Sequence, residues 1–401
     1  GVLEVYTEAV DRVSFASDSD TLTLSPAQEK ALQEIEVSFA EKNTVLLHGV
    51  AASGKTQIYS KLIEQTLAQG KQVLYLLPEI GISVQLTNRL EHFFGDQMSV
   101  YHNKYSTHER VEVWNNVLAQ KEKAQFVLGV RTAVFLPFHN LGLVIVDEEH
   151  DLSYKQAEGQ AGYQVRDVAL MLAHLHGAKT LLGSATPSAE SYYNAQTGKY
   201  GMVRLTERFA DTQPPQVELI DLKEKTQKKE IQGHFSDTLL QAMEQTLSEG
   251  KQVILLQNRR GYAPYLQCEH CDTIPQCPNC DVSLTYHQLQ NQLRCHYCGY
   301  TMAKPVSCPA CQKHNTLQTK GLGTEKVEEE LLQIFPQARI ARMDMDTTKG
   351  KYGFEKIIHN FEKGETDILV GTQMVSKGLD FPRVGLVGIM NADIFLYQQD
   401  F

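Results

Sequence analysis

The segment from Gly49 to Thr56 has the residue types that bind the phosphates of a nucleotide. It reads Gly-Val-Ala-Ala-Ser-Gly-Lys-Thr and lies between an apolar run at Thr44–Leu47 and a helical pattern at Thr56–Gln69. Backbone N–H groups of such a loop, together with the start of the helix, bind phosphate oxygens. We expect Lys55 to reach the β- and γ-phosphates of ATP and Thr56 to ligate Mg²⁺. The residues of this predicted nucleotide site are Gly49, Ser53, Gly54, Lys55 and Thr56.

An acidic segment follows another apolar run. Leu141–Val146 reads as a buried strand, and Asp147-Glu148-Glu149-His150 comes directly after it. A carboxylate at the end of a strand beside a phosphate loop suits Mg²⁺ coordination. We therefore expect Asp147 to hold the metal through water and Glu148 to polarise the attacking water. By itself the segment would be a solvated turn, but together with the phosphate loop it indicates nucleotide hydrolysis.

A third motif, Ser184-Ala185-Thr186-Pro187, follows the predicted strand Thr180–Leu182. Alone it would be a turn. Because it comes in order after the other two motifs, its hydroxyls are expected to sense the phosphate site and relay its state to a partner lobe.

All eight cysteines lie between Cys268 and Cys311, in four pairs of the form Cys-x-x-Cys. Each pair can place two thiolates on one side of a tight turn, and two pairs complete a tetrahedral zinc shell that has no position open for catalysis. The spacing favours two structural zinc ions over disulfides and over iron–sulfur clusters. The residues alone leave two schemes open: nested pairs, in which the inner two resemble a zinc ribbon, and sequential pairs.

The elements that must position these residues follow an α/β pattern. Short apolar runs alternate with helical patterns from about residue 24 onward, which implies parallel sheets covered by helices on both faces. Residues 24–205 form the first predicted lobe, 206–235 a polar connection, and 236–401 a second lobe with a cysteine-rich insertion at 263–315. Residues 1–23 are predicted to be a linker or the remnant of an N-terminal domain. The further predicted strands are Gln72–Leu77, Phe126–Leu128, Gln252–Leu256, Ala338–Ala341 and Asp367–Val370, and the further helices are Ser236–Glu249, Glu325–Ile334 and Tyr352–Phe361.

The composition is that of an ordinary globular protein, with 42% of the 401 residues apolar and 21% charged. The formal net charge of −10 argues against a surface coated in nucleic acid, although it allows a local basic channel. No apolar run is long enough to span a membrane or has the layout of a signal peptide, so we expect a protein of the reducing cytoplasm. Trp114 is expected in the core.

The ordered set of motifs resembles a superfamily-two helicase, and further segments narrow the resemblance to the PriA family of bacterial primosomal helicases. These segments are Tyr101–Asn103, Gly129–Phe135, Asn258–Tyr262, Gly321–Glu325, Arg342–Asp344 and Gly371–Gly378. The resemblance covers residues 24–401 and implies two RecA-like lobes. It implies an ATP-dependent 3′–5′ DNA helicase of the bacterial nucleoid that recognises stalled or forked DNA and initiates primosome assembly and replication restart. The implied partners are forked and single-stranded DNA, primosome proteins and single-strand-binding proteins, with the chain itself a monomer.

The resemblance also implies roles for individual residues. Gln28 would contact adenine, and the segment from Ser153 to Arg166 resembles an aromatic-rich loop that couples DNA contact to hydrolysis. The implied DNA-binding or coupling residues are Arg131, Tyr154, Lys155, Tyr163, Arg166 and Lys377. The family's arrangement favours the nested zinc scheme, with Cys268, Cys271, Cys308 and Cys311 in one site and Cys277, Cys280, Cys295 and Cys298 in the other.

The sequence departs from the family pattern in two places. Ala51 and Ala52 stand where the family usually has Thr and a small Gly or Ser, which keeps the pattern and reduces the flexibility of the loop. The sequence stops at Phe401, before a Gly- and Arg-rich motif that supplies an arginine to the γ-phosphate, so we expect this chain to bind nucleotide but to hydrolyse it poorly. Two alternative functions are a double-stranded DNA translocase or restriction motor, and a zinc-dependent DNA or protein scaffold with a vestigial nucleotide site.

Overall fold

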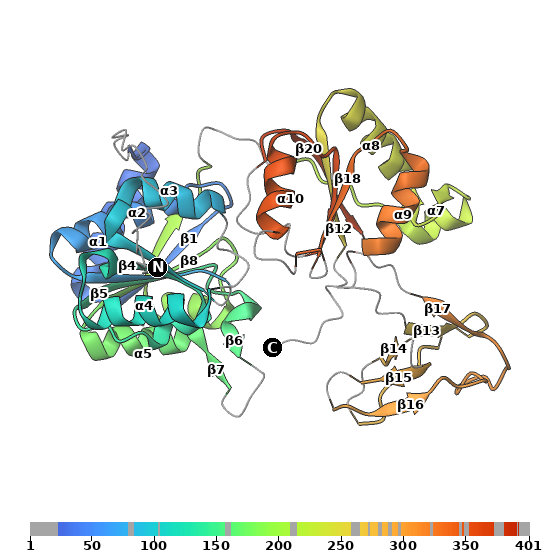
Figure 1. The fold of residues 1–401 in the computed structure, drawn as a ribbon, viewed down its shortest axis with the longest axis horizontal. Coiled ribbons are helices and arrows are strands. Elements are labelled where there is room, and N and C mark those ends of the chain that lie inside the picture. Colours follow the sequence, from blue (N-terminus) through green and yellow to red (C-terminus); the bar gives the residue numbers. More distant parts are fainter. Residues whose placement is uncertain are drawn as a thin grey trace, which may run out of the picture. The chain divides into compact units, whose positions relative to one another are not determined.

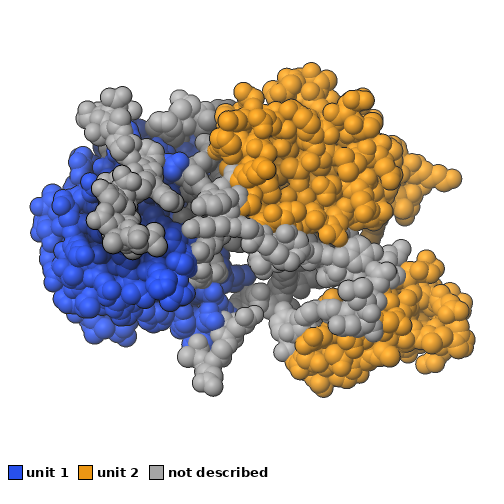
Figure 2. Space-filling model, viewed as in Figure 1, with its two compact units in different colours: residues 1–216 blue, residues 217–401 orange. Residues whose placement is uncertain are grey.

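The chain divides into two compact units, Gly1–Gln216 and Val217–Phe401, and the boundary lies within the predicted connection at 206–235 (Figure 1, Figure 2). The structure is a computed structural model. None of its described helices is both long enough and apolar enough to cross a membrane. The structure describes residues 23–78, 84–102, 105–156, 162–208, 215–257, 265–271, 273–279, 283–287, 291–295, 298–320, 324–344, 347–348, 353–372, 381–390 and 392.

A seven-stranded parallel sheet forms the centre of the first unit, with the strand order β3-β4-β2-β5-β8-β1-β9. Its central strands are almost continuously apolar because helices cover both faces of the sheet. β8 lies between β1 and β5, and its register places Ser184 opposite His48 and Gly183 opposite Asp147. The phosphate loop and the acidic segment therefore meet at one edge of the sheet. The strands are β1 (Thr44–Gly49), β2 (Gln72–Leu76), β3 (Met98–Tyr101), β4 (Phe126–Gly129), β5 (Leu141–Asp147), β8 (Lys179–Ser184) and β9 (Gly201–Leu205).

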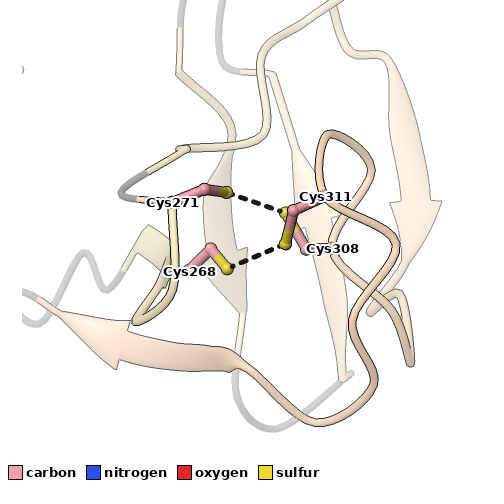
Figure 3. A group of neighbouring side chains, drawn as sticks. All are labelled: Cys268, Cys271, Cys308 and Cys311. Atoms are coloured by element: carbon pink, nitrogen blue, oxygen red, sulfur yellow. Dashed lines mark hydrogen bonds between the residues drawn. The ribbon is translucent and has the colours of Figure 1, made fainter.

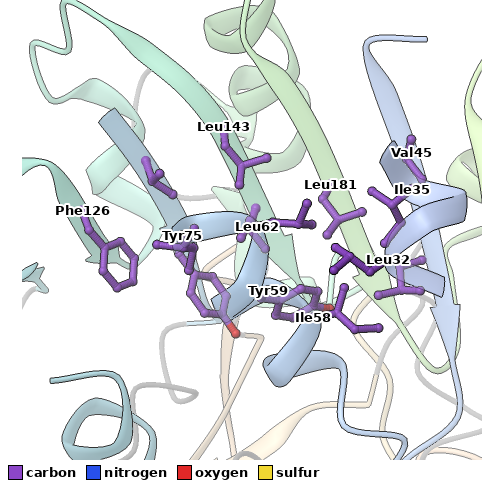
Figure 4. Packing of buried hydrophobic residues seen from close by; sticks show 14 of the residues in the cluster. Leu32, Ile35, Val45, Ile58, Tyr59, Leu62, Tyr75, Phe126, Leu143 and Leu181 are labelled. Atoms are coloured by element: carbon purple, nitrogen blue, oxygen red, sulfur yellow. The ribbon is translucent and has the colours of Figure 1, made fainter. Parts of the chain in front are cut away.

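Helices cover the two faces of this sheet in groups of three. α1 (Pro26–Glu41), α2 (Lys55–Ala68) and α3 (Val84–Phe94) bury one apolar cluster, part of which is drawn in Figure 4. α4 (Thr107–Leu118), α5 (Val165–His176) and α6 (Ala189–Gln196) bury the other. The shorter elements are η1 (Gly95–Gln97), η2 (Glu122–Ala124), η3 (Arg131–Phe135), η4 (Leu152–Tyr154), β6 (Lys155–Gln156) and β7 (Tyr163–Gln164).

The second unit has a smaller parallel sheet, with the strand order β18-β19-β12-β20. One face packs against α8 and α9, and the other against α10. Phe235, the last residue of the predicted connection, is fully buried in the first of these cores, so the end of that segment folds with the second unit. The elements are α7 (Leu222–Gln227), β10 (Ile231–Gln232), β11 (Phe235–Ser236), α8 (Asp237–Ser248), β12 (Gln252–Gln257), α9 (Thr324–Ile334), β18 (Ile340–Met343), α10 (Gly353–Glu362), β19 (Ile368–Gly371) and β20 (Val384–Met390).

The cysteine-rich insertion between β12 and α9 contains two small antiparallel sheets. β13 (Tyr265–Cys268) pairs with β17 (Leu317–Lys320). β14 (Thr285–His287), β15 (Gln292–Arg294) and β16 (Thr301–Ala303) form the other. Its small core combines a few apolar side chains, such as Leu266 and Leu293, with buried cysteines.

The predicted α/β architecture is confirmed, and each predicted strand and helix coincides with an observed one to within a few residues. The prediction for Trp114 is wrong. This residue lies on α4 with 41% of its surface exposed.

Candidate nucleotide and metal sites

The phosphate loop has the backbone and side-chain features that a triphosphate requires. Gly54 adopts a φ of +78° at the start of α2, where a glycine carries no steric penalty. The Lys55 ammonium donates to the Gly49 carbonyl at 3.1 Å, and a Cβ on Gly49 would lie 3.0 Å from the Ser53 hydroxyl. That hydroxyl is buried and has no hydrogen-bond partner among the described residues. The Ser53 hydroxyl can therefore donate to a phosphate oxygen, and Gly49 leaves the space beside it open.

Ala52, within the loop, and Gln28, beside it, have features that the sequence motif did not predict. Ala52 adopts a φ of +59°, a conformation that costs an L-residue roughly 1–2 kcal/mol. Gln28 was expected to contact adenine, but its side chain is 1% exposed and its amide donates to the Ser53 carbonyl at 3.1 Å. Its amide oxygen accepts from the Ser25 backbone N–H at 2.9 Å. In this structure Gln28 therefore ties the start of α1 to the phosphate loop, and its contact with adenine stays a prediction.

Tyrosine hydroxyls hold both carboxylate oxygens of Asp147, which lies at the end of β5. Tyr59 of α2 donates to Oδ1 at 3.0 Å, and Tyr75 of β2 donates to Oδ2 at 3.2 Å. The backbone N–H of Glu148 also donates to Oδ1, at 3.1 Å. Both tyrosines are fully buried, and their rings meet edge to face with centroids 5.6 Å apart (Figure 4). The carboxylate is therefore fixed from three directions.

The electrostatics of Asp147 suit a cation. Burial and the nearby negative charge of Glu148 raise the pKa of the Asp147 carboxyl to about 6, against the opposing effect of the Lys55 charge. Asp147 is thus close enough to Lys55 to feel its charge. A bound cation stabilises the ionised form of a buried carboxylate more than it stabilises that of a carboxylate exposed to water. A fixed carboxylate beside the phosphate-loop lysine fits Mg²⁺ bound with a nucleotide.

The residues after Asp147 connect it to the Ser184–Pro187 motif. Glu148 adopts a φ of +47°, and its carboxylate lies 3.6 Å from the His150 ring. His150 Nδ1 lies 2.8 Å from the Ser184 hydroxyl, and Nε2 lies 3.4 Å from the Thr186 hydroxyl. A strained backbone at the predicted water-polarising residue is typical of functional sites. These contacts supply a path between the acidic segment and the third motif.

Glu149, whose role the motif did not predict, is the centre of a buried network. Its carboxylate is fully buried and accepts from the Ser188 N–H at 2.6 Å, the Ser188 hydroxyl at 2.9 Å and the Ser191 hydroxyl at 2.7 Å. Arg166 of α5 donates to the same carboxylate at 3.3 Å. The network joins the acidic segment to the starts of α5 and α6.

Two of the residues predicted to contact DNA or to couple that contact to hydrolysis lie inside the first unit. Tyr154 is fully buried, and its hydroxyl donates to the Asp147 carbonyl at 2.8 Å, so its ring is not available for stacking on a base. The Arg166 side chain is only 10% exposed and is engaged by Glu149 and Asp167.

The other predicted DNA contacts differ in exposure. Lys155 is exposed on β6, and Arg131 is half-buried at the start of η3. Tyr163 is half-buried, with its ring 5.3 Å from that of Phe135. Lys377 lies outside the described residues. Their contact with DNA stays a prediction.

Two motifs of the second unit lie together. Thr324, at the start of α9, donates its hydroxyl to Asp344 at 2.7 Å, and Arg342 contacts the same carboxylate at 3.4 Å. Residues 258–264, 321–323 and 373–380, which carry parts of the remaining motifs, lie outside the described residues.

The outermost cysteine pairs form a group of four, as the nested scheme predicts. The sulfur atoms of Cys268, Cys271, Cys308 and Cys311 all lie within 4.8 Å of one another (Figure 3). A hydrogen bond with the Thr316 hydroxyl, 3.2 Å from Cys268, lowers the pKa of that thiol to about 6, whereas, against a backbone hydrogen bond from Lys313, burial and the neighbouring sulfurs raise the pKa of the Cys311 thiol to about 11. Four sulfurs at this spacing fit a tetrahedral zinc ion.

The inner cysteines form a second group that contains Cys277, Cys295 and Cys298. Cys280, the predicted fourth ligand, lies outside the described residues. The grouping of Cys268 and Cys271 with Cys308 and Cys311 fits the nested scheme and not the sequential one.

Comparison with known proteins matches three parts of the chain to family models. Residues 25–195 match the DEAD/DEAH box helicase family, residues 277–302 match the PriA DNA helicase Cys-rich region (CRR) domain, and residues 312–399 match the helicase conserved C-terminal domain. The replication restart protein PriA of Bacillus subtilis is 42% identical over 400 residues, which cover 99% of this chain and 49% of that protein. The namesake from Haemophilus influenzae is 42% identical over 380 residues, covering 95% of this chain and 51% of that protein.

The chain belongs to the PriA family. It spans about half the length of the curated PriA proteins it matches. The fold is also found in a solved structure of the DUF1998 helicase MrfA bound to DNA, with a TM-score of 0.54 and 14% identity over 92% of this chain and 44% of that one.

Sequence reasoning missed Tyr59, Tyr75 and the roles of Glu149 and Ser188. The two tyrosines read as apolar core residues of a helix and a strand. The one signal in their favour is that a buried tyrosine hydroxyl usually has a hydrogen-bond partner, which a phenylalanine would not need.

Proposed function

We propose that this chain is the motor of an ATP-dependent DNA helicase, and that the protein containing it restarts replication at stalled or forked DNA. The observation that carries the proposal is the arrangement at one edge of the first sheet. There Gly49–Thr56 opens α2 beside Asp147, and Ser184 ends the strand between them. Membership of the PriA family adds the replication role, because its named relatives are replication restart proteins.

Each residue of the site has a defined part in the proposed reaction. Lys55 binds the β- and γ-phosphates, Thr56 and Asp147 hold Mg²⁺, and Glu148 polarises the attacking water. Bound Mg²⁺ neutralises charge on the phosphates. His150 passes a change at Glu148 to Ser184 and Thr186, with which it is in contact.

The substrate and partners follow from the family. We infer 3′–5′ movement along a DNA strand, recognition of forks, and loading of primosome proteins with the help of single-strand-binding proteins, by a monomer that holds two zinc ions. The negative net charge of the chain restricts DNA contact to local positive sites such as Lys155.

The test is Lys55→Ala in the full-length protein, with Lys61→Ala as the matched control. Lys61 lies on the same helix and pairs only with Glu64 among the described residues. Lys55→Ala should lower DNA-stimulated ATPase and unwinding by about 10²-fold or more, because it removes a preorganised cation from the phosphates. Fork binding should stay unchanged, and Lys61→Ala should behave as wild type.

The outcomes separate the alternatives. Unwinding that survives Lys55→Ala refutes the motor assignment and favours a scaffold. ATPase that drives displacement of a third strand from duplex DNA, without separation of the duplex, indicates a double-stranded DNA translocase. Unwinding of a partial duplex with a 5′ overhang but not a 3′ overhang refutes the proposed direction.

A further inference from the structure

Asp147 uses most of its hydrogen-bonding capacity inside the first unit. Each carboxylate oxygen has two lone-pair positions. Oδ1 accepts from the Tyr59 hydroxyl and from the Glu148 N–H, and Oδ2 accepts from the Tyr75 hydroxyl. Among the described residues these are its only carboxylate donors, so one acceptor position is left, on Oδ2.

The two tyrosines are built into the core and cannot easily take another position. Tyr59 and Tyr75 are fully buried among the helices and strands of one face of the sheet (Figure 4). A buried hydroxyl keeps its partner because losing it would leave an unsatisfied polar group. Their edge-to-face contact fixes each ring against the other.

Gly183 on β8 makes room for the Tyr59 hydroxyl. A Cβ at position 183 would lie 1.7 Å from that oxygen and 3.3 Å from Asp147 Oδ1. The hydroxyl thus occupies the space that any other residue's Cβ would need. Gly183 is also the strand partner of Asp147 and directly precedes Ser184. The requirement for glycine here comes from the tyrosine and not from an unusual backbone conformation.

We infer that Tyr59 and Tyr75 are positioning residues, which hold the Asp147 carboxylate so that it meets the nucleotide-bound Mg²⁺ through a single position on Oδ2. This inference rests on the proposed function. It implies that Asp147 does not chelate the metal through both oxygens, because that would require breaking one of the two hydrogen bonds on Oδ1, from the Tyr59 hydroxyl or the Glu148 N–H. It also assigns Gly183 a role in shaping the metal site, although it contacts neither metal nor nucleotide.

The experiment measures binding of a fluorescent ATP analogue to the 401-residue chain, first in EDTA and then across a Mg²⁺ titration. Tyr59→Phe should leave the affinity in EDTA unchanged and raise the Mg²⁺ concentration at half-maximal effect about tenfold, as expected for the loss of one hydrogen bond to a charged group. Tyr75→Phe should shift it in the same direction, by a smaller factor. The matched control is Tyr154→Phe, which removes an equally buried hydroxyl that donates to the Asp147 carbonyl and not to its carboxylate. Its Mg²⁺ midpoint should match wild type.

A second measurement tests the role of Gly183 by thermal unfolding. Gly183→Ala should lower the melting temperature and raise the Mg²⁺ midpoint, because the new methyl displaces the Tyr59 hydroxyl. The double variant Gly183→Ala with Tyr59→Phe should melt above Gly183→Ala alone, since it removes the atom that clashes most. If the two residues acted independently, the double variant would instead show additive losses in melting temperature.

The outcomes distinguish this inference from the proposed function. If wild type binds the analogue with no effect of Mg²⁺, both fail. Two outcomes refute the positioning role alone, provided that wild type responds to Mg²⁺. In the first, Tyr59→Phe has the same Mg²⁺ midpoint as wild type. In the second, Tyr59→Phe and Tyr154→Phe shift the Mg²⁺ midpoint by the same amount. Strictly additive melting temperatures in the double variant refute the role of Gly183.

Discussion

Replacing Glu149 by glutamine should destabilise the first unit by about 3 kcal/mol, because a buried ion pair that loses one partner leaves an uncompensated charge. The amide keeps the shape of the side chain and one oxygen for the Ser188 N–H. The Ser191 hydroxyl can turn to accept from the new amide group, whereas the Ser188 hydroxyl already accepts from the Ser191 N–H and from Arg166. Arg166 cannot accept, since a guanidinium has only donors, and at 3.3 Å it would face an N–H₂ group in place of Oε2. Arg166 keeps its contacts with exposed Asp167 and with the Ser188 hydroxyl, which hold the loss at the lower end of the range for broken buried pairs.

The assay is urea unfolding of the chain followed by the fluorescence of Trp114, the only tryptophan, which lies in the first unit. With a denaturant slope of about 2 kcal/mol per molar urea, the midpoint should fall by about 1.5 M. The matched control is Glu190→Gln. Glu190 is 70% exposed and lies 3.8 Å from the same arginine, so its loss should cost less than about 1 kcal/mol. Equal midpoint shifts in the two variants would show that burial of the Glu149 pair does not matter, and the reasoning would be wrong.

Three further predictions concern the site and the metals. The pKa of the Asp147 carboxyl is raised from 3.8 to about 6 on folding, so the folded chain holds a proton that the unfolded chain releases. The free energy of unfolding should therefore fall as the pH rises from about 4 to about 6. Over the same range the affinity for ATP with Mg²⁺, measured by calorimetry, should rise. Cys298→Ser should release one of the two zinc ions by atomic absorption, with nucleotide binding unchanged; a zinc content equal to wild type would contradict the nested scheme. Gln28→Ala should weaken the binding of ATP and of GTP by similar factors, because the amide anchors the phosphate loop. A loss of affinity confined to ATP would instead support the predicted contact with adenine.

The parts of the structure that could be predicted from the sequence are those whose signal is local. The phosphate loop needs only glycines, a lysine and a hydroxyl within one turn, and the Cys-x-x-Cys pairs lie within single loops. Within the two parallel sheets, the strands that prediction missed are β3, β9 and β20, which are all edge strands. An edge strand is only partly covered, so β9 and β20 alternate more buried with more exposed residues, whereas the central strand β2 is buried along its whole length. Such alternation gives a weaker signal than the continuous apolar runs by which the central strands were predicted.

The environments of individual side chains could not be predicted, because they depend on contacts between distant segments. Tyr59 and Tyr75 meet Asp147 across 88 and 72 residues of sequence. Tyr154 and Arg166 have the residue types expected for contacts with DNA, and those types are the same whether a side chain faces solvent or the core. Only the fold shows that both are internal.

The burial of Tyr154 and Arg166 changes how DNA contact could reach the nucleotide. These residues flank the hairpin of β6 and β7, one immediately before β6 and one two residues after β7. Tyr154 is hydrogen-bonded to the Asp147 carbonyl, and Arg166 is paired with Glu149, so both ends of the hairpin are fixed to the acidic segment. A displacement of the hairpin therefore cannot occur without moving or breaking contacts to residues on either side of Glu148. Under the proposed function, exposed residues of the hairpin, such as Lys155, contact DNA and the buried pair carries the movement inward, so that neither Tyr154 nor Arg166 needs to touch DNA itself.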